Sequence, residues 1–315
     1  MHPIKPIKHL LALLFVGFLA LSNFGNKAYA GAVIGGSVYW ECITSGVDAG
    51  KFVFYLKIDK DCTVGTLSFP KTLTLRTNTT KTAPLTFVSR TDVTPPQCGT
   101  TCANAGPTDV AVEQYLFKTD PVVISGTPPA EGYKIFADVC CRNEVSNLVY
   151  KSSDKFHFAA TMYPYNGRDL NPCYDSSPEF AEAPITSLCS NYELRYTNHA
   201  EDPDSDSLSY EFAPAFKTGG IQAVDYAAGY STDVPLPGPT IDPNYKLVTI
   251  DPVNGQIVYD GPGNLDGKWN ITTIVKSWRC GKVIASAVRE MTATIKPCTE
   301  PNNLPVISAP TWASP

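Results

Sequence analysis

The sequence predicts an all-β fold of two tandem immunoglobulin-like β-sandwich domains that are stapled by disulfide bonds. Short segments in which apolar and polar residues alternate recur along the chain, and this is the pattern of half-buried strands. Turn-forming pairs such as Pro95-Pro96 and Pro128-Pro129 separate these segments. The 315-residue chain also carries ten cysteines, an even number that favours disulfides in an exported protein.

Residues 1–30 have the features of a secretory signal peptide. Lys5 and Lys8 give a positive start, residues 10–21 form a short apolar core, and small residues at 28–30 suit a signal peptidase. Cleavage there leaves residues 31–315, and an uncleaved membrane anchor is the alternative. No second apolar run has the length of a transmembrane segment, so we expect a secreted protein at the outer cell surface.

The charge balance argues against nucleic acid as a partner. The whole chain has a formal net charge of −5 at pH 7. Removing residues 1–30 removes three lysines and no acid, which leaves 22 basic against 30 acidic residues, a net charge of −8. An acidic chain without a basic stripe suits an extracellular binding surface better than a nucleic-acid interface.

The first domain is expected over residues 31–170. Its alternating segments are residues 51–59, 72–77, 85–89, 110–117, 133–140 and 155–163. A polar stretch rich in turn formers, residues 166–180, then interrupts the alternation and marks a domain boundary.

The second domain is expected over residues 171–298. Its segments are residues 192–197, 207–212, 245–251, 255–260, 268–278 and 287–298. Six or seven such strands in roughly 120 residues fit one sandwich. The Pro-rich residues 299–315 are expected to be a linker or tail.

Spacing suggests some cysteine pairs but does not fix the connectivity. Three residues separate Cys98 from Cys102, which favours a small disulfide-closed loop over a zinc site because no second pair has ligand spacing. A Cys189–Cys298 bond would join the start and end of the second domain, and a Cys42–Cys62 bond would clip the first hairpin. The remaining cysteines stay open: Cys173 with Cys280 is one pairing, and a direct bond between the adjacent Cys140 and Cys141 closes a strained ring.

A run of carboxylates is the candidate metal site. Asp202, Asp204 and Asp206 alternate in a loop, so their side chains can turn toward one point, as Ca²⁺ requires of its oxygen ligands. The EF-hand pattern fails, because its sixth position is Ser207 and its twelfth is Ala213. Further ligands would have to come from other loops.

Three acids are candidates for that further ligand: Asp225, Asp242 and Asp251. The alternative is that the aspartates of the run cap backbone amides in a turn before a strand and bind no metal.

Catalytic chemistry finds little support in the sequence, so the chain is expected not to be an enzyme. Residues 31–315 contain two histidines, His157 inside an alternating segment and His199 beside the carboxylate run. No G-x-S-x-G pattern is present to supply a serine nucleophile. A secreted hydrolase that uses two carboxylates in a cleft between the domains remains as an alternative function.

Several motifs resemble those of large secreted Bacteroidetes proteins that are described as gliding-motility-associated or adhesin-like. The stretch "GGSVYWEC" resembles the opening of that group, and "CCRNEVSNLV" at 140–149 resembles its "CCRN" motif. Residues 176–180 ("SSPEF"), "EDPDSDSLSYEF", "DYAAGYSTDVPLPG" and "IDPVNGQIVY" match further blocks. The resemblance therefore covers nearly all of residues 31–298.

The resemblance implies an extracellular, non-enzymatic role in adhesion or gliding-type surface movement. Such proteins carry immunoglobulin-like, PKD-like or cadherin-like modules. The resemblance therefore implies surface proteins or glycans as partners, and it is compatible with self-assembly of the chain. Ser205 stands where the group has Gly in its "DPDGD" motif, and no sorting domain is recognised after Cys298. Ca²⁺ bound at residues 202–206 would stiffen the junction between the two domains.

A carbohydrate-binding module is the alternative binding function. Trp269, Trp278 and Trp312 can stack on sugar rings if they are exposed in a row, whereas inward-facing rings would serve the core.

Overall fold

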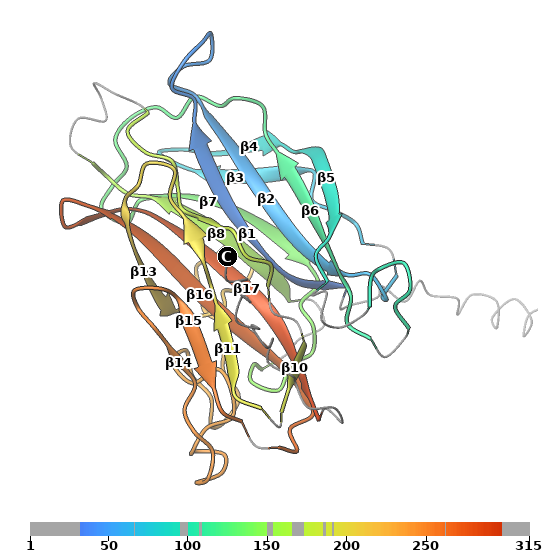
Figure 1. The fold of residues 1–315 in the computed structure, drawn as a ribbon. Helices are drawn as coiled ribbons and strands as arrows, with labels where there is room; N and C mark the ends of the chain where they lie inside the picture. Colours follow the sequence, from blue (N-terminus) through green and yellow to red (C-terminus); the bar gives the residue numbers. More distant parts are fainter. Residues whose placement is uncertain are drawn as a thin grey trace, which may run out of the picture.

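The computed structural model describes residues 32–65, 67–94, 100–106, 109–149, 154–165, 173–184, 187–190, 192–261 and 263–297. The predicted signal peptide, the tail, Cys98, Cys298 and Trp312 lie outside these residues. The described chain is all-β (Figure 1), and it contains no helix long and apolar enough to cross a membrane. The strands are β1 (Val33–Cys42), β2 (Phe52–Asp61), β3 (Thr72–Arg76), β4 (Thr80–Pro84), β5 (Thr86–Asp92), β6 (Val112–Lys118), β7 (Tyr133–Cys140), β8 (Lys155–Met162), β9 (Glu179–Phe180), β10 (Ser187–Cys189), β11 (Leu194–Thr197), β12 (Ala200–Glu201), β13 (Ser207–Phe212), β14 (Thr249–Ile250), β15 (Gln256–Tyr259), β16 (Gly267–Arg279) and β17 (Lys282–Lys296).

Twelve of these strands belong to one continuous sheet, so the prediction of two tandem sandwiches is wrong. Its main path runs β4-β3-β7-β8-β17-β1-β2-β6-β5, and every pair along it is antiparallel. The decisive pairing joins β1 near the start of the chain to β17 near its end, with Gly35 opposite Met291 and Ser37 opposite Arg289. Alternation along a strand reveals the strand but not its partner, and this partner lies about 250 residues away in the sequence.

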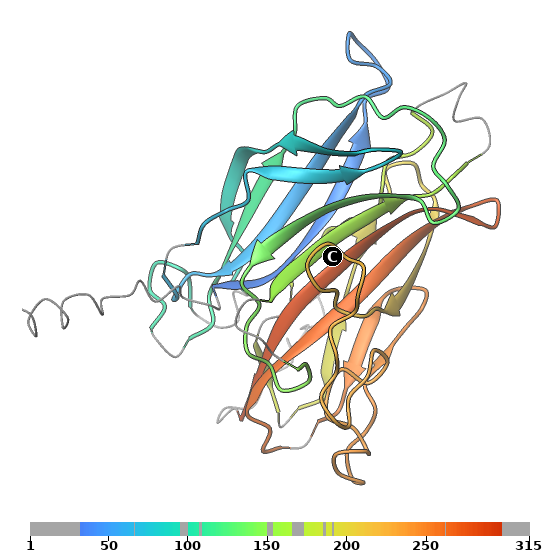
Figure 2. The same cartoon turned by 180° about the vertical axis from the view of Figure 1, so that it is seen from behind.

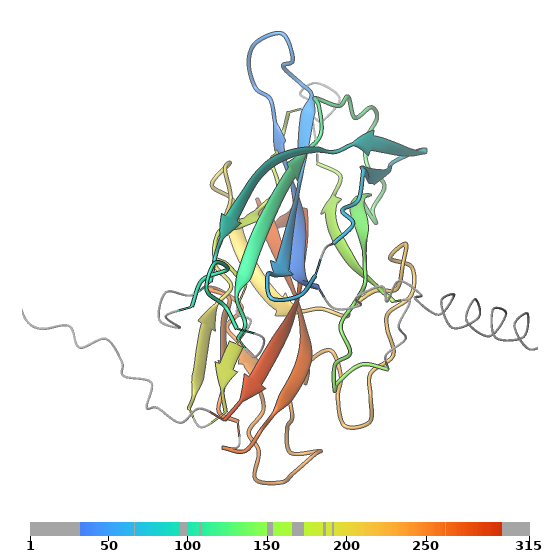
Figure 3. The ribbon, with the colours of Figure 1, turned by 90° about the vertical axis from the view of Figure 1, so that its right-hand side faces the viewer.

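The nine strands of that path form a nearly closed, barrel-like sheet around the first core. Its two edge strands, β4 and β5, are consecutive in the chain and are separated only by Leu85. Seen from the side, β5, β6 and β2 lie opposite β7 and β8 (Figure 3). Alternate residues of each strand point inward, and in β2 these are Phe52, Phe54, Leu56 and Ile58, all completely buried.

A second core forms below the first on the same sheet. β16 and β17 make a long hairpin, and β13 pairs with the outer edge of β16. The separate three-stranded sheet β11-β15-β14 covers this hairpin (Figure 1). Buried Trp269, Ile271, Met291 and Ile257 fill the space between the two layers. The chain therefore has two cores, as two domains would, but one sheet passes through both.

β17 connects the two cores because three strands share its second edge. Ala285–Ala287 pair with β8, Arg289–Met291 pair with β1, and Thr294–Lys296 pair with the parallel strand β10. Viewed from behind, β7 and β8 run beside β17 and β16 across one face of the molecule (Figure 2). This shared face carries the pocket described further below.

Close packing of β1 against β8 makes one glycine indispensable. A Cβ atom at Gly36 would lie 2.5 Å from the carbonyl oxygen of Lys57 and 2.7 Å from the ring of Phe158. We expect Gly36→Ala to lower the free energy of unfolding by about 1–3 kcal/mol, as overpacking does, measured by urea unfolding.

Gly106→Ala is the matched control. Its nearest neighbour would be the Asp109 carboxylate at 3.4 Å, an ordinary contact distance, so a change within about 0.5 kcal/mol is expected. Equal effects of the two substitutions would contradict the close approach of β1 to β8.

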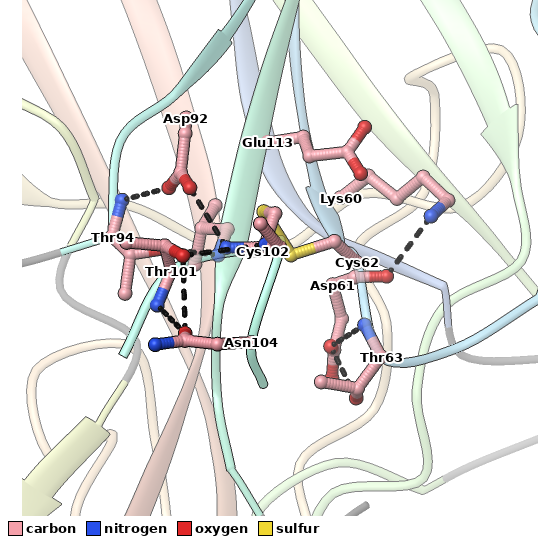
Figure 4. The surroundings of a disulfide bond; sticks show 12 residues. Lys60, Asp61, Cys62, Thr63, Asp92, Thr94, Thr101, Cys102, Asn104 and Glu113 are labelled. Atoms are coloured by element: carbon pink, nitrogen blue, oxygen red, sulfur yellow. Dashed lines mark hydrogen bonds between the residues drawn. A yellow bond between two sulfur atoms is a disulfide. The ribbon is translucent and has the colours of Figure 1, made fainter. Parts of the chain in front are cut away.

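The disulfides differ from the predicted pairs. Cys42 is bonded to Cys173 and not to Cys62. Cys62 is bonded to Cys102, so Cys102 does not pair with Cys98 either (Figure 4). One carboxylate contact helps to hold this bond in place: Asp92 accepts the amide hydrogen of Cys102 at 2.7 Å.

The remaining cysteines complete this picture. Cys140 and Cys141 are bonded to each other across a cis peptide bond. Cys280 is a free, exposed thiol, so it does not pair with Cys173. Cys189 is disulfide-bonded and lies opposite Lys296 in the β10–β17 pair, whereas Cys298, its predicted partner, lies outside the described residues. Several disulfides in one chain indicate that it folds in an oxidising compartment.

Candidate calcium site

Four aspartates from two separate segments form what we call the acidic cluster: Asp175, Asp202, Asp204 and Asp206. Asp202 begins the turn between β12 and β13, and its Oδ1 accepts the amide hydrogens of Asp204 at 2.9 Å and Asp206 at 3.2 Å. Ser205 has a positive φ of 63°, a conformation that glycine adopts more easily. The predicted capping role of these aspartates is therefore present, but it uses only one oxygen of Asp202.

The second segment, residues 173–177, brings Asp175 to this turn. Its neighbours bind the end of β1: Ser177 Oγ accepts the Trp40 amide hydrogen at 2.8 Å, and Ser176 Oγ accepts that of Cys42 at 3.2 Å. The Ser176 amide in turn donates to Asp204 Oδ2 at 2.6 Å. The acidic cluster thus lies where β1 meets the β12–β13 turn.

One cation faces the acidic cluster. Arg279, at the end of β16, donates to both carboxylate oxygens of Asp206 at 2.9 and 2.6 Å and approaches Asp175 Oδ1 at 3.4 Å. Its hydrogen bonds to Asp206 raise the pKa of the guanidinium, with further support from the charges of Asp206 and Asp175. One positive charge against four carboxylates leaves the acidic cluster strongly negative when all four are ionised.

Two buried oxygens of the acidic cluster have no hydrogen-bond partner within the described residues. They are Oδ2 of Asp175, whose side chain is 1% exposed, and Oδ2 of Asp202. Burial, together with the charges of Asp202 and Asp204, raises the pKa of Asp175 to about 9, although Arg279 opposes the shift. Burial also raises the pKa of Asp202. Unsatisfied buried acceptors are costly, and a bound cation would satisfy them.

The carboxylates stand wider apart than a closed coordination shell. Calcium binds oxygens at about 2.3–2.6 Å. Within the described residues, the one set of three metal-capable side chains with all ligand atoms within 4.8 Å of one another is Cys62, Cys102 and Glu113, whose cysteines are bonded to each other. The donors of the acidic cluster suit a hard cation, but binding would have to draw the β12–β13 turn and residues 173–177 together.

The further ligands suggested by the sequence are engaged elsewhere. Asp225 pairs with Lys217 at 3.2 Å, Asp242 accepts the Asn244 amide hydrogen, and Asp251 caps a turn at Val253. The acid that the structure brings beside the carboxylate run is instead Asp175. It directly precedes the "SSPEF" motif, but nothing in its spacing links it to the carboxylate run.

No protein-family model, no curated protein and no solved structure matches this chain. Function is therefore inferred from the geometry of the chain and from the motifs of its sequence.

Proposed function

We propose that this chain is a non-enzymatic protein of the extracellular surface, which acts in adhesion or surface movement and is stiffened by Ca²⁺ at the acidic cluster. The observation that carries the calcium assignment is the pair of buried, unpartnered oxygens of Asp175 and Asp202. The adhesive role is supported by the motif resemblance and by the disulfides, which suit a surface exposed to proteases and shear.

Calcium at this place would couple three parts of the fold. Residues 173–177 are fixed to β1 by the Cys42–Cys173 bond and by the two serine hydroxyls. Asp202, Asp204 and Asp206 precede β13, which belongs to the second core. A cation shared between these segments resists their separation, so force applied to one core would reach the other with little bending at the junction.

Of the three tryptophans in the carbohydrate-binding alternative, the two that the structure describes lend it no support. Trp269 is 3% exposed and packs in the second core, where its Nε1 donates to the Tyr230 hydroxyl at 3.2 Å. Trp278 is half-buried and donates to Ser209. Neither ring is exposed, so neither belongs to an exposed row.

Thermal unfolding with and without Ca²⁺ tests the calcium site. If Ca²⁺ binds with a Kd of about 10 μM, then 1 mM Ca²⁺ stabilises the folded state by about 2.7 kcal/mol, which raises Tm by about 5–10 °C in a chain of this size. We expect Asp175→Asn and Asp202→Asn each to abolish this response. Because Asp175 is buried beside other carboxylates, Asp175→Asn should leave Tm in EGTA unchanged or higher.

Asp251→Asn is the matched control, since Asp251 caps a turn outside the acidic cluster. It should keep the full calcium response, even if its own Tm falls slightly. No response of the wild-type chain to Ca²⁺ would refute the site and return these aspartates to turn capping and ion pairing.

Attachment assays test the adhesive role itself. Cells that produce the wild-type chain should attach to their substratum more firmly than cells that lack it, and EGTA or Asp175→Asn should reduce the difference. Equal attachment with and without the chain would contradict adhesion even if Ca²⁺ binds.

A further inference from the structure

A pocket of about 340 Å³ lies on the face that the two cores share, away from the acidic cluster. Its floor is the outer surface of β7, β8, β17 and β16, which run side by side in Figure 2. The segment 214–220 between β13 and β14 forms one wall. This volume is in the range of pockets that hold small organic ligands.

The floor is apolar because small and aliphatic side chains meet there. The small side chains of Ala159 and Ser286 create the hollow. Ile274 and Val288 line it and are only partly buried. Phe216 closes the side formed by the segment 214–220. A ligand with an apolar body would cover this surface, and sugar hydroxyls would find few partners on it.

Three cations surround this apolar floor, although the protein as a whole is acidic: Arg76, Lys134 and Lys276. Lys276 is paired with Glu211 at 2.5 Å, whereas the described ion pairs include no carboxylate for Arg76 or Lys134. Lys134 donates to the Thr161 hydroxyl at 3.0 Å, and its burial lowers its pKa. A partly buried ammonium with donors to spare is a good anchor for an anion.

The wall of the pocket is held in place before any ligand arrives. Arg76 donates to the Gly219 carbonyl at 3.1 Å and stacks on the Phe136 ring at 4.9 Å. Asp138 binds the Gly219 amide at 3.1 Å and His157 Nδ1 at 2.8 Å. Gly220 packs so tightly that a Cβ atom there would lie 2.2 Å from His157 Nε2. Binding therefore costs little reorganisation.

We propose that this pocket binds a small organic carboxylate with an apolar ring or chain, its anionic group between Arg76 and Lys134 and its body on Ala159, Ile274 and Val288. Charge complementarity selects the anion, and the aliphatic floor selects the apolar body. Free small acids and the C-terminal residue of a peptide share this chemistry. This inference is independent of the acidic cluster and goes beyond the proposed adhesive role.

Calorimetry with 4-phenylbutyrate as the probe tests the proposal. We expect saturable binding to the wild-type chain, at least tenfold weaker binding of the neutral 4-phenylbutyramide, and at least tenfold weaker binding of glucuronate. Lys134→Met should weaken 4-phenylbutyrate binding at least tenfold, and Ala159→Phe should abolish it by filling the hollow. Lys282→Met, which removes an exposed lysine outside the pocket, is the matched control and should bind normally.

Each variant is checked for an unchanged Tm. Each titration is repeated in EGTA, so the binding result can be interpreted even if the acidic cluster binds no Ca²⁺. A peptide ending in Phe, tested with a free and an amidated C-terminus, separates a peptide source from a free acid. Equal binding of the acid and its amide, preference for glucuronate, or undiminished binding to Ala159→Phe would overturn the proposal.

Discussion

Replacing Glu290 with alanine is expected to lower the free energy of unfolding by about 3–5 kcal/mol, because it leaves Arg142 buried and unpaired. Both side chains are 1% exposed. Glu290 accepts hydrogen bonds from Arg142 Nε at 2.7 Å and Nη2 at 3.0 Å, and from Asn270 at 2.7 Å. Burial alone would disfavour the charge on Arg142, but the Glu290 carboxylate outweighs it and raises the pKa of the guanidinium.

Urea unfolding followed by circular dichroism measures this loss, and two further variants interpret it. Glu211→Ala removes an ion pair with Lys276 whose members are 57% and 26% exposed, so it should cost less than about 1 kcal/mol. Glu290→Gln keeps an acceptor for Asn270 but removes the charge. Its loss of unfolding free energy should lie between those of Glu290→Ala and Glu211→Ala. A loss from Glu290→Ala no larger than that from Glu211→Ala would show that Arg142 reaches water.

The same ion pair gives the "CCRN" motif a structural role. Arg142 and Asn143 belong to "CCRN", the segment that directly follows β7. Arg142 binds Glu290 of β17 and the Phe216 carbonyl at 3.1 Å, and Asn143 donates to the Val33 carbonyl of β1 at 2.9 Å. The motif thus holds β1, β17 and the wall of the pocket together, which is a structural task that its composition does not reveal.

Most strands were predictable from local pattern, and the exceptions have physical reasons. β7 was expected at residues 133–140 and is found there, because its alternate residues Tyr133, Ile135 and Ala137 face the first core. β1 was not expected. Eight consecutive residues of it are buried, so its burial does not alternate, and Gly35 and Gly36 interrupt its β-branched and aromatic residues.

Pairing was harder to predict than strand positions. The segment of β17 from Ile284 to Ala287 is buried at four consecutive residues, with Ala285 in the first core and Ala287 packed beside Tyr210 and Val275. Local sequence gives no sign of a strand shared in this way, and the expected boundary at residue 170 therefore suggested two independent sandwiches. Cysteine spacing failed for the same reason: Cys42 and Cys173 are 131 residues apart and meet only through the fold.

The candidate site was predictable in part. The alternate spacing of Asp202, Asp204 and Asp206 made them candidates in the sequence, and the structure brings them together in one turn. Asp175 lies in a polar stretch that the sequence predicts only as a domain boundary. Tertiary contacts, which the sequence does not reveal, bring it to the β12–β13 turn. The pocket could not be predicted from the sequence, because Arg76, Lys134 and Lys276 come from three separate strands.

Removing the Cys42–Cys173 bond by a double serine substitution is expected to lower the free energy of unfolding by about 2–5 kcal/mol. Its members are 131 residues apart, so the bond closes a long loop in the unfolded chain. The Cys62–Cys102 bond spans 40 residues, and by loop entropy its removal should cost about 1 kcal/mol less. Urea unfolding in a Cys280→Ser background measures both without thiol exchange at the free cysteine.

The two bonds should differ more in their effect on calcium than in their effect on stability. Cys173 fixes the segment that carries Asp175, whereas Cys62–Cys102 ties the end of β2 to residues 100–106. Loss of Cys42–Cys173 frees Asp175 from the β12–β13 turn, so the calcium-induced rise in Tm should fall by at least half. Loss of Cys62–Cys102 should leave that rise intact at a lower starting Tm. An equal calcium response in both variants would mean that β1 and residues 173–177 are held together without the disulfide, and that Ser176 and Ser177 suffice to position Asp175.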